Sequence, residues 1–260
     1  MQAAVSHRAA PDSWFICAKP NVDAKVRLFC LPFAGGGAST YHSWPQAFPQ
    51  DVEIRALQLP GRESRMREPR FTVAVSLAEA LADAIEPYLD RPFAFFGYSM
   101  GALLAFEAAR ALRRRGHALP AQLFVAAMRA PHVRGLVPPL ARLPREELLR
   151  EVRRHYEPPE ATFEIPELID VLLPVLRDDM ALVDDYTYAA EPPLACAIDA
   201  YIGARDRSVP VEAAARWREQ STGAFALSVL PGGHFFLQEA LPQLQREVAA
   251  RLQALATGPQ

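Results

Sequence analysis

The stretch that decides the fold covers residues 93–106 and reads FAFFGYSMGALLAF. Its apolar beginning is typical of a buried strand, its small-residue end is typical of a helix, and the pattern G-x-S-x-G at residues 97–101 joins the two. Glycines on either side of Ser99 allow a tight turn from strand to helix, which lifts the serine hydroxyl off the sheet. The start of the helix adds partial positive charge beside that hydroxyl. We therefore interpret Ser99 as a candidate nucleophile; the alternative is a serine that only caps a helix.

Apolar segments with the length of strands alternate with helical segments on both sides of this motif. Strands are expected at residues 26–31, 52–59, 93–96, 123–127, 196–203 and 225–230, and helices at residues 73–89, 101–115, 211–220 and 236–256. Such alternation is typical of a mostly parallel central sheet flanked by helices on both faces. Because G-x-S-x-G between a strand and a helix is a feature of α/β-hydrolases, the sequence predicts an α/β protein with the α/β-hydrolase fold.

The alternation stops between residues 132 and 190. This stretch contains two helical segments, around residues 145–155 and 166–185, with prolines between them, and it is too long for a plain crossover. We predict an α-helical lid insertion above the carboxyl edge of the sheet, where such sheets place their sites. The alternative is an excursion that covers nothing. The expected organisation is an extended leader at residues 1–24, a hydrolase core at residues 25–131 and 191–257, and the insertion at residues 132–190.

Composition and charge argue against several classes of protein. The 260 residues carry a net charge of −2, and half of them are apolar, which excludes nucleic-acid binding through bulk positive charge. No apolar run approaches the roughly 18 residues of a membrane span, and the first fifteen residues lack the pattern of a secretory signal. Cys17, Cys30 and Cys196 have no C-x-x-C spacing, which argues against a disulfide scaffold or a zinc ribbon. We expect a cytoplasmic monomer that binds neither nucleic acid nor membrane.

A nucleophilic serine needs a base, and the base needs an orienting acid. In α/β-hydrolases the chain order is serine, then acid, then histidine. His234 follows the strand expected at residues 225–230 and a Pro-Gly-Gly turn, so it is the predicted base; the alternative is a histidine that caps the last helix. The other histidines lie in the leader, before or shortly after the turn at Ser99, or in or beside the insertion: His7, His42, His117, His132 and His155.

The acid should follow the preceding strand. Asp206 lies just after the strand expected at residues 196–203 and is the predicted acid, with capping of the next helix as the alternative. Asp199 would lie within that strand, and Asp184 and Asp185 lie in the insertion.

An oxyanion hole requires two backbone N–H groups. One is expected from Met100, the residue after the nucleophile, and the second from the loop LPFAGGGA at residues 31–38. Three glycines in this loop let the backbone approach a ligand. A phosphate-binding loop is the alternative, but no G-K-[ST] follows and G-x-G-x-x-G does not fit.

Seven separated motifs carry a family resemblance: LFCLPFAGGGAS, LQLPGRE, FFGYSMGALLAFEAAR, MRAP, LRDDMALVDDYTY, IGARDRSVP and LPGGHFFL. Together they resemble type II thioesterases, the free-standing α/β-hydrolases of polyketide and nonribosomal peptide biosynthesis. The resemblance covers residues 14–255, and related medium-chain fatty acyl thioesterases share the pattern. Tyr98 departs from it, since the family usually has histidine there, and little effect on the chemistry is expected.

The resemblance implies site residues, partners and a role. Ser99, Asp206 and His234 match the catalytic triad, Ala34 and Met100 match the oxyanion donors, and residues 176–188 match the lid region. The implied partners are acyl or peptidyl carrier proteins, whose phosphopantetheine arm carries the acyl group, and no metal or dissociable cofactor is implied. The implied role is the removal of stalled or misprimed acyl groups. Because the chain contains no carrier segment of its own and ends soon after its last helix, action in trans is expected.

Other functions fit the same residues. A carboxylesterase or lipase-like hydrolase would use an identical triad, and a chain-terminating thioesterase for medium-chain fatty acyl carrier proteins is a rival within the family. A binding or scaffold protein on a hydrolase fold would be expected to have a degraded triad, and the complete triad counts against it.

The first helix of the insertion, at residues 144–156, offers a candidate docking surface. It carries Arg145, Arg150, Arg153 and Arg154, which could steer an acidic carrier protein. Three glutamates on the same helix offset this charge, so an ordinary solvated helix face is the alternative.

Overall fold

The fold is built on a central β-sheet. In a computed structural model the structure describes residues 13–159 and 166–257, and within them a seven-stranded sheet has the order β1-β3-β2-β4-β5-β6-β7. All neighbouring strands pair in parallel except β1, which is antiparallel to β3. The strands are β1 Phe15–Ile16, β2 Val26–Leu31, β3 Val52–Leu57, β4 Phe93–Tyr98, β5 Gln122–Ala126, β6 Ala197–Gly203 and β7 Phe225–Leu230. The predicted mostly parallel sheet is confirmed.

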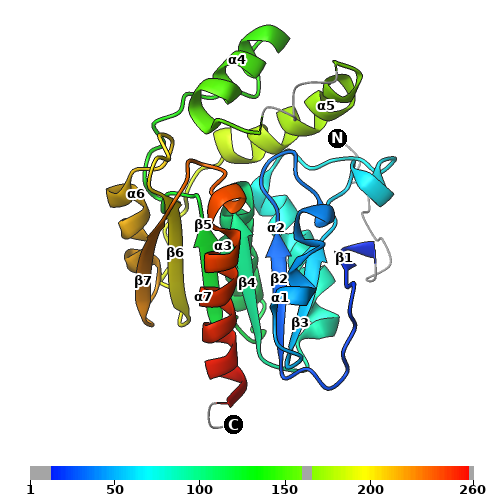
Figure 1. The fold of residues 1–260 in the computed structure, drawn as a ribbon, viewed down its shortest axis with the longest axis vertical. Helices are drawn as coiled ribbons and strands as arrows, with labels where there is room; N and C mark the ends of the chain where they lie inside the picture. The colour runs from blue at the N-terminus through cyan, green and yellow to red at the C-terminus, as the bar shows by residue number, and fades with distance from the viewer. Residues whose placement is uncertain (1–12, 160–165, 258–260) are drawn as a thin grey trace.

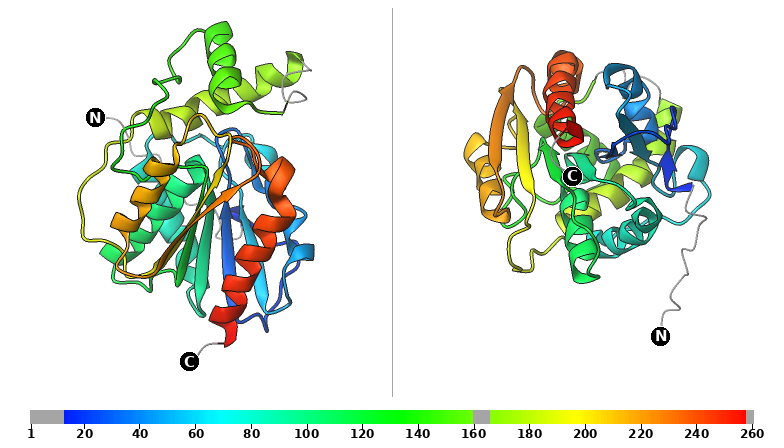
Figure 2. Two further views of the ribbon diagram at one scale, coloured as in Figure 1. Left: turned by 60° about the vertical axis from the view of Figure 1, so that its left-hand side comes forward. Right: turned by 90° about the horizontal axis from the view of Figure 1, so that it is seen from below.

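Helices cover both faces of the sheet, as Figures 1 and 2 show. The short helix α1 (Trp44–Ala47) and the last helix α7 (Leu237–Thr257) pack on one face, and α2 (Ala74–Ile85) and α3 (Met100–Arg114) pack on the other. The remaining core helix, α6 (Val211–Ala215), contacts β6 and β7. Because both faces are covered, the central strands β2, β4 and β5 are buried along their whole length, which explains why their sequences are mostly apolar.

Several boundaries differ from the sequence prediction. Part of the predicted leader joins the sheet, because Phe15 and Ile16 pair with Leu57 and Ala56; residues 1–12 of that leader lie outside the described residues. The strand predicted at residues 52–59 ends at Leu57. The helix predicted at residues 73–89 ends at Ile85, just before Pro87, and continues as one 3₁₀ turn. The helix predicted at residues 211–220 divides into α6 and a 3₁₀ segment at residues 216–220. The short helical turns at residues 38–47 were not predicted.

The insertion forms a separate layer at one end of the sheet. Its helices α4 (Arg145–Tyr156) and α5 (Pro166–Asp184) lie above the sheet in two views (Figures 1 and 2). Apolar side chains of these helices and of the segment before α4 form a small core of their own, which includes Leu140, Leu148, Val152 and Met180. Since β4 enters α3 at this same end, the insertion lies over the strand-to-helix turn that contains Ser99.

Candidate active site

The turn between β4 and α3 holds Ser99 in a strained backbone conformation. Its φ is 53° and its ψ is −117°, values that a residue with a side chain rarely adopts. The Ser99 N–H donates to the carbonyl of Ala126 on β5, at 2.7 Å. A Cβ atom at Gly97 would lie 2.3 Å from the Gly101 carbonyl, and one at Gly101 would lie 2.2 Å from the Leu31 carbonyl. Both glycines of the motif are therefore required by close backbone packing.

His234 faces Ser99 from the loop that follows β7. Its Nε2 atom lies 3.1 Å from the Ser99 Oγ, and its side chain is only 4% exposed. The Tyr98 hydroxyl donates a hydrogen bond to the backbone carbonyl of His234, and the Tyr156 ring of the insertion contacts the imidazole edge-on at 4.7 Å between centroids. Tyr98 thus fixes the backbone of the loop that carries the histidine.

Asp206 completes a hydrogen-bonded chain from the loop after β6. Its Oδ2 atom lies 2.9 Å from the Nδ1 of His234, and its carboxylate is fully buried. Its other oxygen accepts hydrogen bonds from the hydroxyl and N–H of Ser208 and from the N–H of Val209. Burial raises the pKa of the Asp206 carboxyl, but the hydrogen bonds and charge of His234, together with Ser208, outweigh it and lower the pKa below its usual value. Asp206 is therefore a carboxylate at neutral pH.

Ser208 is a member of this chain that the sequence analysis missed. Its Oγ lies 2.7 Å from Asp206 Oδ1 and 3.0 Å from His234 Nδ1, so it touches both partners. A signal was available, because aspartate commonly accepts a hydrogen bond from the backbone N–H two residues later. The contact with His234, however, depends on the position of a loop 26 residues further along the chain.

The competing acids and histidines lie elsewhere. Asp199, within β6, pairs with Arg251 of α7 at 2.9 Å. Asp184 accepts hydrogen bonds from the N–H groups of Leu140 and Ala141, and Asp185 pairs with Arg142.

Each of the other described histidines has a partner of its own. His42 contacts the Ser39 carbonyl, and His117 pairs with Glu86. His132 contacts Gln220 and Glu219, and His155 pairs with Glu151. His7 lies outside the described residues. The structure brings together Ser99, Asp206 and His234.

Two backbone N–H groups are available beside Ser99. Met100 is the first residue of α3, so its N–H has no acceptor within the helix. In the loop after β2, the Gly35 N–H donates to Asp179 and the Gly36 N–H donates to the Phe33 carbonyl, whereas the N–H of Ala34 has no acceptor in the described part of the chain. Ala34 and Met100 line the same cavity as Ser99. Their placement is suited to an anionic oxygen bound at the serine.

A cavity of about 790 Å³ opens at Ser99 and His234. A volume of this size accommodates a small organic ligand, and an apolar lining suits an apolar part of such a ligand. The insertion forms much of its wall, with apolar side chains from α4 and α5 that include Leu149, Val152, Leu172, Leu173, Leu176, Met180 and Val183. The predicted position of the insertion over the candidate site agrees with this wall.

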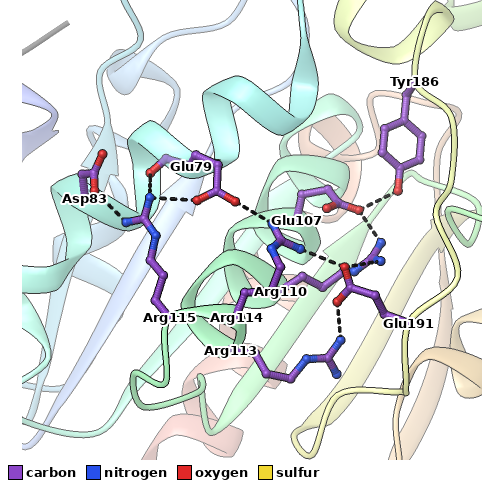
Figure 3. A network of polar contacts seen from close by, with 9 residues as sticks. All are labelled: Glu79, Asp83, Glu107, Arg110, Arg113, Arg114, Arg115, Tyr186 and Glu191. Atoms are coloured by element: carbon purple, nitrogen blue, oxygen red, sulfur yellow. Dashed lines mark hydrogen bonds and ion pairs between the residues drawn. The ribbon is translucent and has the colours of Figure 1, made fainter. Parts of the chain in front are cut away.

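A polar network ties the end of the insertion to α3, the helix that starts beside Ser99 (Figure 3). Glu107 accepts hydrogen bonds from Arg110 and from the Tyr186 hydroxyl, at 2.7 and 2.6 Å, and both carboxylate and guanidinium are almost completely buried. Arg110, Arg113 and Arg114 all pair with Glu191. Tyr186 also lines the cavity. The chain that leaves α5 is thus fixed to the core beside the apolar wall of the cavity.

Among residues 13–159 and 166–257, no group of three or more histidine, cysteine, aspartate or glutamate side chains is arranged to hold a metal ion. In the same ranges, no helix combines the length and apolar content needed to cross a membrane.

Comparisons with known proteins bear on this site. A family model described as a thioesterase domain matches residues 26–252. The gramicidin S biosynthesis protein GrsT of Aneurinibacillus migulanus is 39% identical over 229 residues, which are 88% of this chain and 90% of that protein. The solved structure of RedJ, a thioesterase from the prodiginine biosynthetic pathway in Streptomyces coelicolor, is 38% identical, with a TM-score of 0.83 over 87% of this chain and 90% of that chain. The type II thioesterase BorB from the borrelidin biosynthetic cluster is 33% identical, with a TM-score of 0.83 over 93% and 97%. The family match includes the turn at Ser99, the insertion, Asp206 and His234.

Proposed function

The chain belongs to the thioesterase family, and we propose that it is a stand-alone serine thioesterase that hydrolyses acyl thioesters on the phosphopantetheine arm of acyl or peptidyl carrier proteins. The role would be the editing of polyketide or nonribosomal peptide synthases whose carriers hold stalled or misprimed groups. The observation that carries this proposal is the unbroken contact from Asp206 through His234 to Ser99 at the mouth of a cavity with an apolar wall.

The mechanism follows from the contacts of these residues. Ser99 Oγ attacks the thioester carbonyl, and His234 Nε2 takes the serine proton across the 3.1 Å contact. Asp206 holds the imidazole with Nδ1 protonated and stabilises its positive charge. The N–H groups of Ala34 and Met100 donate to the oxyanion. His234 gives its proton to the leaving thiolate, and the serine ester remains.

The second half of the reaction uses the same groups. His234 removes a proton from water, which attacks the ester carbonyl, and the oxyanion forms again at Ala34 and Met100. Collapse returns the proton to Ser99 and releases the carboxylic acid. Every step uses side-chain and backbone groups of this chain. The phosphopantetheine arrives with the carrier protein, and no metal or dissociable cofactor enters the scheme.

The proposal predicts a preference among substrates that a general esterase would not have. The measurement is the rate of acid release from a panel of acyl-loaded carrier proteins of different chain length, compared with p-nitrophenyl esters of the same acids. We expect kcat/KM on carriers to exceed that on the esters by at least about tenfold, since binding of the non-reacting carrier contributes to transition-state binding. Faster hydrolysis of the free esters would identify a carboxylesterase. A sharp optimum for medium-length fatty acyl chains would identify a chain-terminating thioesterase.

Carrier docking on α4 gives a second testable prediction. Arg150 is 64% exposed in its side chain and lies 3.4 Å from Glu151 and 3.7 Å from Glu147 of the same helix. Reversing both Arg150 and Arg153 to glutamate would therefore leave α4 strongly acidic. If α4 receives an acidic carrier, KM for the acyl-carrier substrate should rise roughly tenfold at low salt and less at high salt.

A small acyl thioester without a carrier serves as the internal reference, and its rate should not change. Arg246→Glu on α7 is a matched exposed reversal outside the insertion, and it should leave both substrates unaffected. Equal responses of the two substrates, or no response of either, would show that α4 is an ordinary solvated face.

A further inference from the structure

A buried ion pair lies next to the loop that carries Ala34. The guanidinium of Arg62, from the loop after β3, makes two hydrogen bonds to the carboxylate of Asp179, from α5 of the insertion, at 2.6 and 2.7 Å. Arg62 is 5% exposed and Asp179 is 1% exposed. The two residues are 117 positions apart, so the insertion must be folded onto the core for the pair to form.

Both members of the pair also hold the glycine-rich loop. Asp179 Oδ2 accepts the N–H of Gly35 at 2.7 Å, and Arg62 Nη1 donates to the carbonyl of Gly36 at 2.9 Å. Gly35 has a φ of 82°, and three glycines in a row leave this backbone with unusual conformational freedom. The ion pair therefore fixes the peptide group between Ala34 and Gly35 through its N–H, and the peptide group between Gly36 and Gly37 through its carbonyl.

We propose that Arg62 and Asp179 are positioning residues that hold the Ala34 N–H in the oxyanion hole. The inference rests on the proposed function, because it concerns an oxyanion formed at Ser99. It links a residue of the insertion to the reaction: Asp179 supports the oxyanion loop, while Leu176 and Met180 of the same helix line the cavity. One helix thus sets both the wall of the cavity and the position of an oxyanion donor.

Stability alone does not explain this ion pair. Burying two charges has a desolvation cost, and replacing a buried pair by apolar side chains of similar volume is often neutral or stabilising. Arg62 also has a buried Nε with no hydrogen-bond partner among the described residues, which adds a further cost. A pair kept for packing would not need contacts with the backbone of Gly35 and Gly36, whereas a positioning pair requires them.

The test replaces both charges together. Arg62→Met with Asp179→Leu keeps the volume, removes the charges and removes both contacts with the glycine loop, and we expect the fold and the melting temperature to be retained. We expect kcat on an acyl-carrier substrate to fall by about 10- to 100-fold, since a displacement near 1 Å at a catalytic group can cost about 100-fold. KM should stay within about twofold, because the oxyanion contact forms only in the transition state. Affinity for an alkyl boronic acid, which forms a tetrahedral adduct at Ser99, should fall by the same factor as kcat.

A matched control lies at the other end of the sheet. Arg27 and Glu53 form a buried pair at 2.7 Å near the amino ends of β2 and β3, and they are 7% and 3% exposed. Arg27→Met with Glu53→Leu makes a comparable change in the core without touching the glycine loop. It should leave kcat and boronic acid affinity within about twofold of wild type.

The possible results distinguish a failure of the positioning role from a failure of the proposed function. Wild-type kcat and boronic acid affinity in the Arg62/Asp179 variant would overturn the positioning role, and so would equal losses in the control pair. If the double variant fails to fold, Asp179→Asn decides: the isosteric amide leaves too few acceptors for Gly35 and Arg62, and a kcat equal to wild type would overturn the inference. A wild-type protein that releases no acyl group from any carrier would refute the proposed function itself, and with it this inference.

Discussion

Replacing Ser99 by alanine is expected to lower kcat for thioester hydrolysis by about 10⁴- to 10⁶-fold and to leave the protein folded. The loss is large because the attacking atom itself is removed, and the other hydroxyl that contacts His234, Ser208 Oγ, lies at Nδ1 and not at the Nε2 atom that faces Ser99. The fold should be retained because alanine has the same Cβ as serine, so it adds no steric strain at a φ of 53°. Within the described residues, the side-chain hydrogen bond that disappears is the 3.1 Å contact between Oγ and His234 Nε2.

Single-turnover release of the acyl group from a loaded carrier, measured beside circular dichroism and thermal melting, checks this prediction. Ser228→Ala is a matched control, since Ser228 lies on β7 with its hydroxyl near Glu247 and outside the site; it should keep full activity. A fluorophosphonate probe should label the wild-type protein and the control but not Ser99→Ala. A variant that retains more than about a tenth of wild-type activity would show that Ser99 is not the nucleophile.

The fold was predictable where the signal is local. Strands β2, β4 and β5 are mostly apolar because helices cover both faces of the sheet, and such apolar stretches are visible in the sequence. Strand β1 was not predictable, because it has only two residues and exists through pairing with β3, about forty positions away. The short turns at residues 38–47 are likewise stabilised by tertiary packing, with Trp44 and Tyr41 buried against α7's face of the sheet.

The candidate site was also predictable only in part. Ser99, Asp206 and His234 each follow the carboxyl end of a strand, and the carboxyl ends of parallel strands meet at one edge of the sheet. Their meeting could therefore be expected from strand order alone. The Arg62–Asp179 pair depends on the path of the insertion back over the core, which has no periodic signal. Tyr98, expected to matter little, donates to the His234 carbonyl, a contact that only the folded loop after β7 creates.

Asp206→Asn is expected to slow turnover by about 10⁴-fold, whereas Asp199→Asn should leave kcat within about twofold. In the structure Asp206 accepts from His234 Nδ1 at 2.9 Å, which keeps the Nε2 atom unprotonated and facing Ser99. Asparagine can present its NH₂ group to Nδ1 instead, and this favours the tautomer with a proton on Nε2, which cannot take the serine proton. Asp199 lies within β6 and pairs with Arg251, so its amide variant changes nothing at Ser99.

The comparison of the two variants is informative because both remove one negative charge from the same strand and the loop after it. A general effect of net charge or of stability would therefore act on both, and only a specific contact with His234 would separate them. The measurement is kcat for an acyl-carrier substrate from pH 6 to 9, with folding checked by circular dichroism at each pH. A specific role predicts that the activity of Asp206→Asn stays low across this range, because the amide of asparagine does not ionise and favours the wrong histidine tautomer at every pH in it. A larger loss in Asp199→Asn than in Asp206→Asn would assign the acid to the strand and overturn the arrangement proposed here.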